Sequence, residues 1–129
     1  MTFLNPVRNI TFDAHDPYAV ARFWAALTGY ALGDAAPGDE EVQLDPAQQG
    51  APGLLFLRVP DDKKVKNRVH LDIQPPSGTR DAEVERLRAL GATVLDDLRT
   101  PDGLGWVVMA DIEGNEFCVE RSAVERGLA

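Results

Sequence analysis

Apolar and polar residues alternate along two distant segments of the chain. Residues 9–14 read Asn-Ile-Thr-Phe-Asp-Ala, and residues 68–73 read Arg-Val-His-Leu-Asp-Ile. A period of two is typical of a strand with one buried face. Each segment carries an Asp at the same place and is followed by a Pro-containing turn and an amphipathic helical pattern. Two copies of this pattern in 129 residues indicate a duplicated βα module.

Each copy predicts one helix. The first is expected over Asp16–Thr28, because Asp is a preferred N-cap and the Pro that follows it suits the first helical position. The second is expected over Thr79–Leu90, with Thr79 as its N-cap. Gly29 and Gly91 follow the two helices, where capping glycines are common. The apolar stripes that should face a core are Val20, Phe23, Trp24 and Leu27 in the first helix, and Val84, Leu87 and Leu90 in the second.

Eight short segments predict strands, so that each half of the chain reads β-α-β-β-β. They are Val7–Ala14, Tyr30–Leu32, Glu41–Leu44, Gly53–Val59, Asn67–Gln74, Thr93–Leu95, Gly105–Ala110 and Glu116–Arg121. Asp111–Asn115 is expected to be a tight turn that joins the last two strands. The predicted fold class is therefore α+β, in one domain over residues 1–129. Module one covers about residues 5–60 and module two about 66–121, joined by the charged connector Asp61–Lys66; the tail after Arg121 is expected to form one loose turn.

Composition and charge exclude some partners. The formal net charge is −8 and the pI is about 4.6, which argues against a nucleic acid or an anionic membrane as partner, since both need clustered Lys and Arg. The single cysteine, Cys118, excludes an intrachain disulfide and allows a reducing compartment. The N-terminus lacks the pattern of a signal peptide, and no apolar run is long enough to span a membrane. We therefore expect a cytoplasmic protein.

Alternation along the strands separates apolar faces, which must pack on the helices, from faces that carry polar side chains. If the sheet curls, the polar faces line a concave cavity, the usual form of a small-molecule site. The residues expected in this cavity are Thr11, Asp13, Arg58, Arg68, His70, Asp72, Cys118 and Glu120.

These features together resemble the vicinal oxygen chelate superfamily, and within it the glyoxalase-like, bleomycin-resistance-like domains. The resemblance rests on the duplication, the Asp-Pro helix start, Phe23-Trp24, the run Lys66–Asp72 and the closing run Asp111–Cys118, although Ile112 stands where the family usually has Pro. It covers about Asn5–Arg121 and implies two βαβββ modules in a cupped, mostly antiparallel sheet with the helices outside. It also implies a homodimer, with metal and substrate bound inside the cup.

The resemblance also assigns positions to metal ligands, and this chain departs from the pattern there. The chelating positions fall on Asn9, Arg68 and Cys118 and, less surely, on Phe56. Arg and Phe offer no donor to a divalent metal, and Asn is a weak neutral ligand. We therefore expect no metal and no cofactor, which removes the basis for inferring glyoxalase, dioxygenase or thiol-transferase activity. A register shifted by two residues would instead bring together His70, Glu120 and Asp13.

The individual site residues have structural readings beside functional ones. His70 can act as a general base oriented by a carboxylate, or be a structural histidine. The charged residues can bind a polar ligand or form an internal ion-pair network. Cys118 can be reactive or simply packed, and the two tryptophans, Trp24 and Trp106, can stack on a ligand or, as we expect, pack in the core.

Three functions remain open at this point. The favoured one is binding of a small polar or cationic molecule in the cup, whose ligand-binding residues would also include Asn9 and Phe56. The second is a metal-independent enzyme that uses His70 with a carboxylate. The third is a dimeric scaffold with a vestigial site.

Overall fold

A computed structural model of the chain describes residues 4–128. Contacts between residues divide the chain into two compact units, residues 1–62 and 63–129. Each unit contains one helix and one open, mixed sheet, so the fold class is α+β as predicted. Among the described residues no helix is long and apolar enough to cross a membrane.

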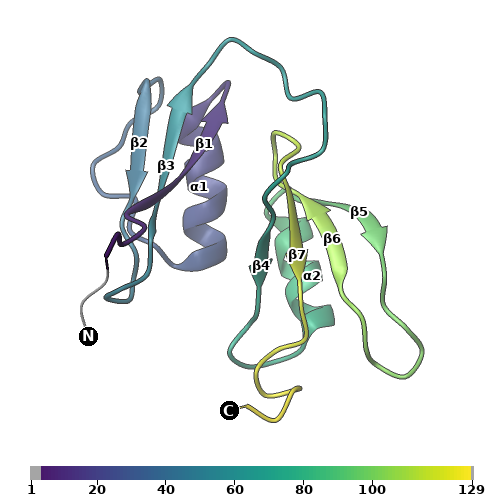
Figure 1. The fold of residues 1–129 in the computed structure, drawn as a ribbon. Helices are drawn as coiled ribbons and strands as arrows, with labels where there is room; N and C mark the ends of the chain where they lie inside the picture. The colour runs from purple at the N-terminus through teal and green to yellow at the C-terminus, as the bar shows by residue number, and fades with distance from the viewer. Residues whose placement is uncertain (1–3, 129) are drawn as a thin grey trace. The chain divides into compact units, whose positions relative to one another are not determined.

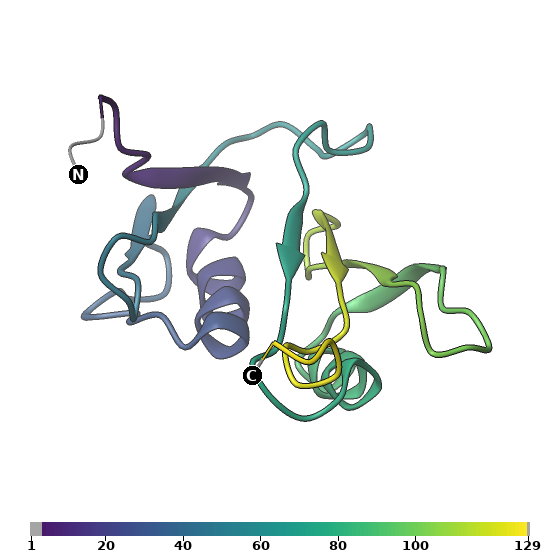
Figure 2. The ribbon, with the colours of Figure 1, turned by 60° about the horizontal axis from the view of Figure 1, so that its bottom comes forward.

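The first unit consists of β1 (Asn9–Ala14), α1 (Pro17–Thr28), β2 (Glu41–Leu44) and β3 (Gly53–Arg58). The sheet order is β1-β3-β2, with β1 parallel and β2 antiparallel to β3. Figures 1 and 2 show α1 along one face of this sheet. The strand expected at residues 30–32 is reduced to an isolated bridge between Ala31 and Asp45.

The start, end and buried stripe of α1 agree with the prediction. The Asp16 carboxylate accepts a hydrogen bond from the backbone N–H of Ala19 at 3.2 Å, which satisfies one of the free N–H groups of the first turn. Gly29 ends the helix in the left-handed region, at φ 80°. The ring of Phe12 on β1 lies 5.3 Å from that of Trp24, so the apolar face of β1 packs on α1.

The second unit consists of β4 (Leu71–Ile73), α2 (Arg80–Ala89), β5 (Thr93–Asp97), β6 (Val107–Ala110) and β7 (Glu116–Val119). The sheet order is β4-β7-β6-β5; β4 is parallel to β7, and the other neighbours are antiparallel. In both units, therefore, the first and last strands lie side by side (Figure 1). Phe117 and Val119 of β7 are fully buried on the face toward α2.

Two details of the second unit differ from the prediction. The strand expected over Asn67–Gln74 is shorter, because residues 67–70 form a bend in which the His70 ring nitrogen Nε2 lies 2.9 Å from the carbonyl oxygen of Asn67. Val69, expected in the apolar set, is consequently 74% exposed. Leu90 caps α2 and is 37% exposed, so the buried stripe of that helix ends at Leu87.

The turn before β7 forms as predicted and is held by one buried carboxylate. Asp111 is 4% exposed, and its Oδ1 accepts hydrogen bonds from the backbone N–H groups of Glu113 and Asn115 at 2.9 and 3.0 Å. Gly114 has φ 90°, a conformation that glycine adopts without a steric penalty. The turn sets the register between β6 and β7, and thereby the positions of the polar side chains on β7.

Candidate ligand-binding site

A hollow of ≈ 490 Å³ lies in the second unit, on the face of the sheet opposite α2. Its volume falls within the range of small-molecule sites. Hereafter "the hollow" means this space, which is lined by Asp72, Gly105, Trp106, Cys118, Glu120, Arg121 and Arg126. Three of these residues, Asp72, Cys118 and Glu120, belong to the predicted set.

The pairing of β4 with β7 brings these three side chains together. Asp72 lies opposite Cys118 in the parallel register, so both side chains point to the same face. Glu120 follows β7, and its N–H donates to the carbonyl oxygen of Ile73 at 2.8 Å, which continues the ladder by one step. Alternation then directs Glu120 to the face of Cys118. Strand alternation predicted that these side chains share a face, and the register of β4 with β7 places Asp72 and Cys118 in this way.

Trp106 is a residue of the hollow that sequence reasoning assigned to the core. It is 46% exposed, whereas Trp24 on α1 is 1% exposed and packs against Phe12 of β1. The signal was present in the sequence, because Trp106 alternates with Val107 and Met109, both of which are fully buried. The hollow therefore has an aromatic surface next to its carboxylates.

The surroundings of the Cys118 thiol disfavour its thiolate form. Burial is the main cause that raises the pKa of Cys118, and the neighbouring carboxylates of Asp72 and Glu120 act in the same direction, while Lys66 opposes them. The thiolate is the nucleophilic form of cysteine. A raised pKa thus argues against Cys118 as a nucleophile and leaves it as a small, weakly polar part of the wall.

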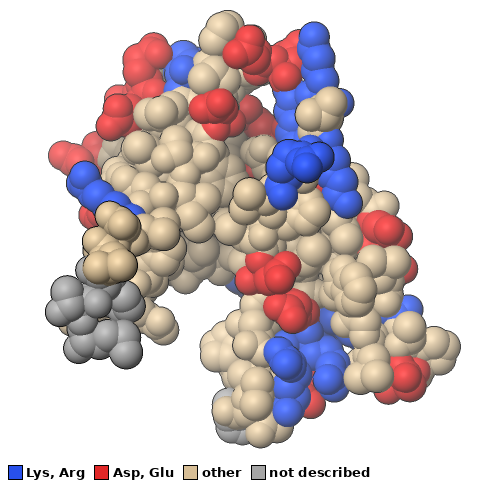
Figure 3. Space-filling view, in the orientation of Figure 1, with Lys and Arg blue, Asp and Glu red and all other residues tan. Residues whose placement is uncertain are grey.

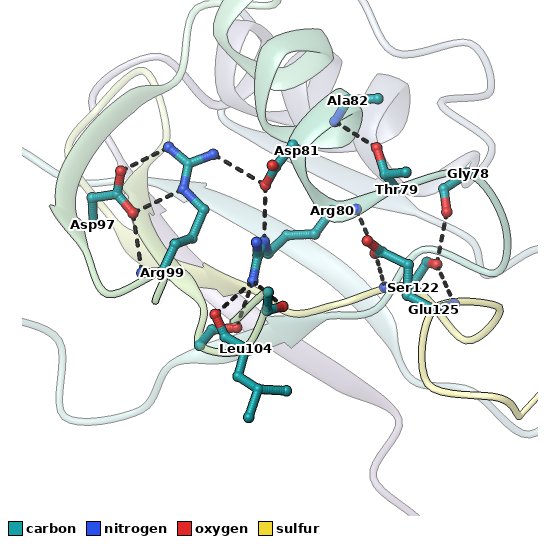
Figure 4. Close-up of polar contacts among 12 residues, drawn as sticks. Gly78, Thr79, Arg80, Asp81, Ala82, Asp97, Arg99, Leu104, Ser122 and Glu125 are labelled. Atoms are coloured by element: carbon teal, nitrogen blue, oxygen red, sulfur yellow. Dashed lines mark hydrogen bonds and ion pairs between the residues drawn. The ribbon is translucent and has the colours of Figure 1, made fainter. Parts of the chain in front are cut away.

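Arg80 holds the wall of the hollow that contains Gly105 and Trp106. This side chain belongs to α2 and is 5% exposed. Its Nη1 donates to the carbonyl oxygens of Leu104 and Gly105 at 3.1 and 3.0 Å, and its Nε contacts Asp81 at 3.0 Å (Figure 4). Because the guanidinium replaces water as the partner of these carbonyls, the loop that presents Trp106 is fixed to the helix.

The C-terminal segment also lines the hollow and is anchored to the same helix end. The Glu125 carboxylate accepts hydrogen bonds from the backbone N–H groups of Arg80 and Ser122 at 2.6 and 2.8 Å (Figure 4). Ser122 is fully buried and donates to the carbonyl oxygen of Gly78. The tail forms the single turn that the sequence suggested, but this turn is anchored and not loose. Its anchoring brings Arg121 and Arg126 into the lining of the hollow, although Arg121 was predicted as the last residue of a strand and Arg126 lies outside any predicted strand.

Three predicted residues of the first unit lie on the face of its sheet that α1 leaves open. Asn9, Thr11 and Asp13 alternate there with the residues that pack on the helix. Asn9 accepts a hydrogen bond from Gln43 at 2.8 Å, a contact that sequence reasoning did not foresee. The two amides meet above Gly53, where a side chain would come within 2.6 Å of both.

Phe56 and Arg58 lie on the other face, toward α1. Phe56 is in register with Phe12, is fully buried and stacks on that ring at 4.9 Å, so its side chain belongs to the core. Arg58 is in register with Ala14 and donates to the carbonyl oxygen of His15 at 2.9 Å, while its Nε contacts Glu40 at 3.3 Å. The prediction that Arg58 shares a face with Thr11 and Asp13 was wrong. Its register with Ala14 places Arg58 on the other face of the sheet.

Arg68 and His70 lie in the exposed bend before β4 and not on a strand. His70 contacts the carbonyl oxygen of Asn67, and neither residue lines the hollow. Within residues 63–128 no ion pair joins Arg68 to Asp72 or Glu120, so this unit contains no such internal ion-pair network.

Residues of the charged connector Asp61–Lys66 make polar contacts with other parts of the chain. The His15 ring contacts the carbonyl oxygen of Asp61 and the carboxylate of Asp62, at 2.8 and 3.2 Å. Lys63 forms a 2.9 Å ion pair with Glu116. Burial acts to raise the pKa of Glu116, but the hydrogen bonds from Lys63 and from the Asn67 backbone hold that pKa below its ordinary value.

The residues at the positions that the resemblance assigns to chelation do not fit a divalent metal. Phe56 is a core residue without a donor and Arg68 is an exposed cation, so of the four positions only Cys118 offers a strong ligand atom and Asn9 a weak neutral one. Over residues 4–128 no group of three or more His, Cys, Asp or Glu side chains is placed to hold a metal ion.

A family model described as the glyoxalase-like domain matches residues 9–120. The chain belongs to the glyoxalase-like domain family. The resemblance of the sequence to glyoxalase-like domains is thereby confirmed. A search of curated proteins finds no match.

Solved structures of this glyoxalase-like fold are similar to the chain at low sequence identity. A glyoxalase-related enzyme from Fulvimarina pelagi has 22% identity and a TM-score of 0.63, over 91% of this chain and 88% of that one. A glyoxalase/bleomycin resistance protein/dioxygenase family enzyme from Burkholderia phytofirmans PsJN has 18% identity and a TM-score of 0.62, over 86% and 94%. The fosfomycin resistance protein FosX from Listeria monocytogenes, in a mutant form complexed with Mn(II) and a dihydroxypropylphosphonic acid, has 17% identity and a TM-score of 0.65, over 98% and 97%. At these identities the likeness concerns the fold alone.

Proposed function

We propose that this glyoxalase-like protein binds a small molecule with a cationic or polar group and an apolar body, and that the hollow is the site. The observation that carries the proposal is the composition of the hollow: Asp72 and Glu120 lie beside the exposed ring of Trp106. Carboxylates attract a cation, and an indole face adds a cation–π contribution. Volume, concavity and a few convergent polar groups are the usual features of such a site.

The metal-dependent chemistries of the superfamily receive no support from these residues. The chelating positions do not fit a metal, and the hollow contains neither a histidine nor a thiol poised as a thiolate. Elemental analysis of the purified protein should find no stoichiometric Zn, Fe, Ni or Mn. About one such ion per chain would contradict this part of the proposal.

The test uses phenethylammonium as a probe, since it combines a cation with an apolar ring. Trp24 is buried and Trp106 exposed, so a change in tryptophan fluorescence during titration reports on the hollow. We expect a saturable change together with backbone amide shifts at Asp72, Trp106 and Cys118. At a probe concentration of about 100 times its Kd, the protein should gain about 2.7 kcal/mol of stability.

Variants separate specific binding from general attraction to an acidic protein. Asp72→Asn and Glu120→Gln should each weaken binding of the probe. Asp96→Asn is the matched control, because Asp96 is an exposed carboxylate on β5 of the same sheet but does not line the hollow. An equal loss in all three variants, or a titration that never saturates, would contradict the proposed site.

A further inference from the structure

The hollow contains charges of both signs. Asp72 and Glu120 carry two negative charges, and Arg121 and Arg126 carry two positive ones. Figure 3 shows acidic and basic side chains next to each other over the part of the second unit where β4, β7 and the C-terminal segment lie. Across residues 4–128, none of the four takes part in an ion pair.

Asp72 lies on β4, Glu120 and Arg121 directly follow β7, and Arg126 belongs to the turn that Ser122 and Glu125 anchor to α2. These hydrogen bonds hold the backbone segment from which the two arginines project. Opposite charges that share a hollow without neutralising each other are available to a ligand with two complementary charges.

We propose that the ligand of the hollow is a zwitterion with an aromatic body, such as an aromatic amino acid or a close derivative. Its ammonium group would contact Asp72 and Glu120, its carboxylate would contact Arg121 and Arg126, and its ring would pack on Trp106. Arginine forms paired hydrogen bonds with a carboxylate, which makes it a selective partner for this group. The inference rests on the proposed function and specifies the ligand class of the same site.

Ligands with one charge satisfy only part of this arrangement. A simple cation meets the carboxylates but makes no favourable contact with either guanidinium group and is repelled by both. A simple anion meets the arginines but approaches Asp72 and Glu120 in a protein of net charge −8. A zwitterion of fitting length avoids both repulsions.

Three probes with the same ring test the inference on the full chain: phenylalanine, phenethylammonium and 3-phenylpropionate. Binding is measured for each by amide shifts and by the fluorescence of Trp106. Phenylalanine should bind roughly three- to tenfold more tightly than phenethylammonium, because partly exposed ion pairs contribute little individually. The anion should bind most weakly of the three.

The arginines are then replaced in two variants, Arg126→Gln alone and Arg126→Gln together with Arg121→Gln. Both variants should abolish the higher affinity for phenylalanine than for phenethylammonium. Arg126 is exposed, so its single variant tests the inference even if the double variant folds poorly. Arg88→Gln, an exposed arginine on α2, is the control and should preserve the advantage.

The outcomes separate this inference from the proposed function. If phenylalanine and phenethylammonium bind equally, the zwitterion inference is overturned while the binding function stands. If phenylalanine binds more tightly but Arg126→Gln leaves its advantage unchanged, the role of the arginines is overturned. If none of the three probes binds at the hollow, both proposals fail.

Discussion

Replacing Arg80 with Met tests whether its side chain holds the wall of the hollow that contains Gly105 and Trp106. Met retains apolar volume but cannot donate to the carbonyl oxygens of Leu104 and Gly105, which Arg80 contacts at 3.1 and 3.0 Å. Hydrogen bonds to a charged group contribute about 1.5–3 kcal/mol each, but water can reach part of this loop in the variant. We therefore expect a loss of about 2–4 kcal/mol in the free energy of unfolding. For a chain of this size that lowers Tm by roughly 10 °C.

The matched control is Arg88→Met, on the same helix. Arg88 forms an exposed ion pair with Glu85 at 3.5 Å, and exposed pairs contribute little. Its variant should change stability by no more than about 0.5 kcal/mol. Thermal denaturation measures both variants.

Hydrogen exchange supplies a local readout for the same experiment. The N–H groups of Leu98 and Thr100 donate to the carbonyl oxygens of Trp106 and Leu104 at 3.0 Å, so both amides should exchange faster in Arg80→Met. Equal losses of Tm in the two variants would refute the special position of Arg80. So would unchanged exchange at Leu98 and Thr100.

The remaining predictions concern backbone, pH dependence and assembly. Gly105→Ala should destabilise the protein by several kcal/mol, because the new Cβ would lie 2.0 Å from the carbonyl oxygen of Leu98. Gly103→Ala has open space around the new Cβ and should lower the free energy of unfolding by only about 1–2 kcal/mol, because of its positive φ. Denaturant unfolding compares the two variants. Hydrogen bonds from Arg99 lower the pKa of Asp97 from 3.8 to about 2, so the contribution of this carboxylate to stability is present above pH 3.8 and is lost as the pH falls toward 2. In Arg99→Gln, carboxyl NMR titration should show the pKa of Asp97 move upward. An unchanged pKa would contradict the role of Arg99. We expect a homodimer from the family resemblance, and light scattering that gives the mass of one chain at all concentrations would contradict it.

Much of the fold could be predicted because its signals are local. Asp16 and Thr79 cap the two helices, and Gly114 allows the turn before β7, through interactions that span only a few residues. The bend at residues 67–70 could not be predicted, because it depends on the contact of Asn67 with Glu116, a residue far along the chain. An alternating pattern alone does not show where a strand starts to pair.

The candidate site divides in the same way. Asp72 and Cys118 followed from strand alternation, because each sits inside a strand and the period of two assigns its face. The sequence prediction placed Arg58 on the wrong face of β3. Alternation along β3 does not show which of its faces points to α1, and the register with β1 that settles this is not visible in the sequence. Arg121 is the last residue of the predicted strand Glu116–Arg121, where alternation assigns it to the face of Phe117 and Val119, and Arg126 lies outside any predicted strand.

The sequence by itself determined the two helices with their N-caps, the central residues of most strands, and that two similar modules follow each other. These properties depend on steric and hydrogen-bonding preferences within a few residues of each position. Only the tertiary structure decided which polar residues meet in the hollow. That outcome depends on three contacts: the pairing of β4 with β7, the hydrogen bonds of the buried Arg80 guanidinium, and the hydrogen bond that the Glu125 carboxylate accepts from Arg80. In each contact the two partners are separated by a long stretch of chain. Such contacts form only when packing brings the partners together, and no local rule specifies them.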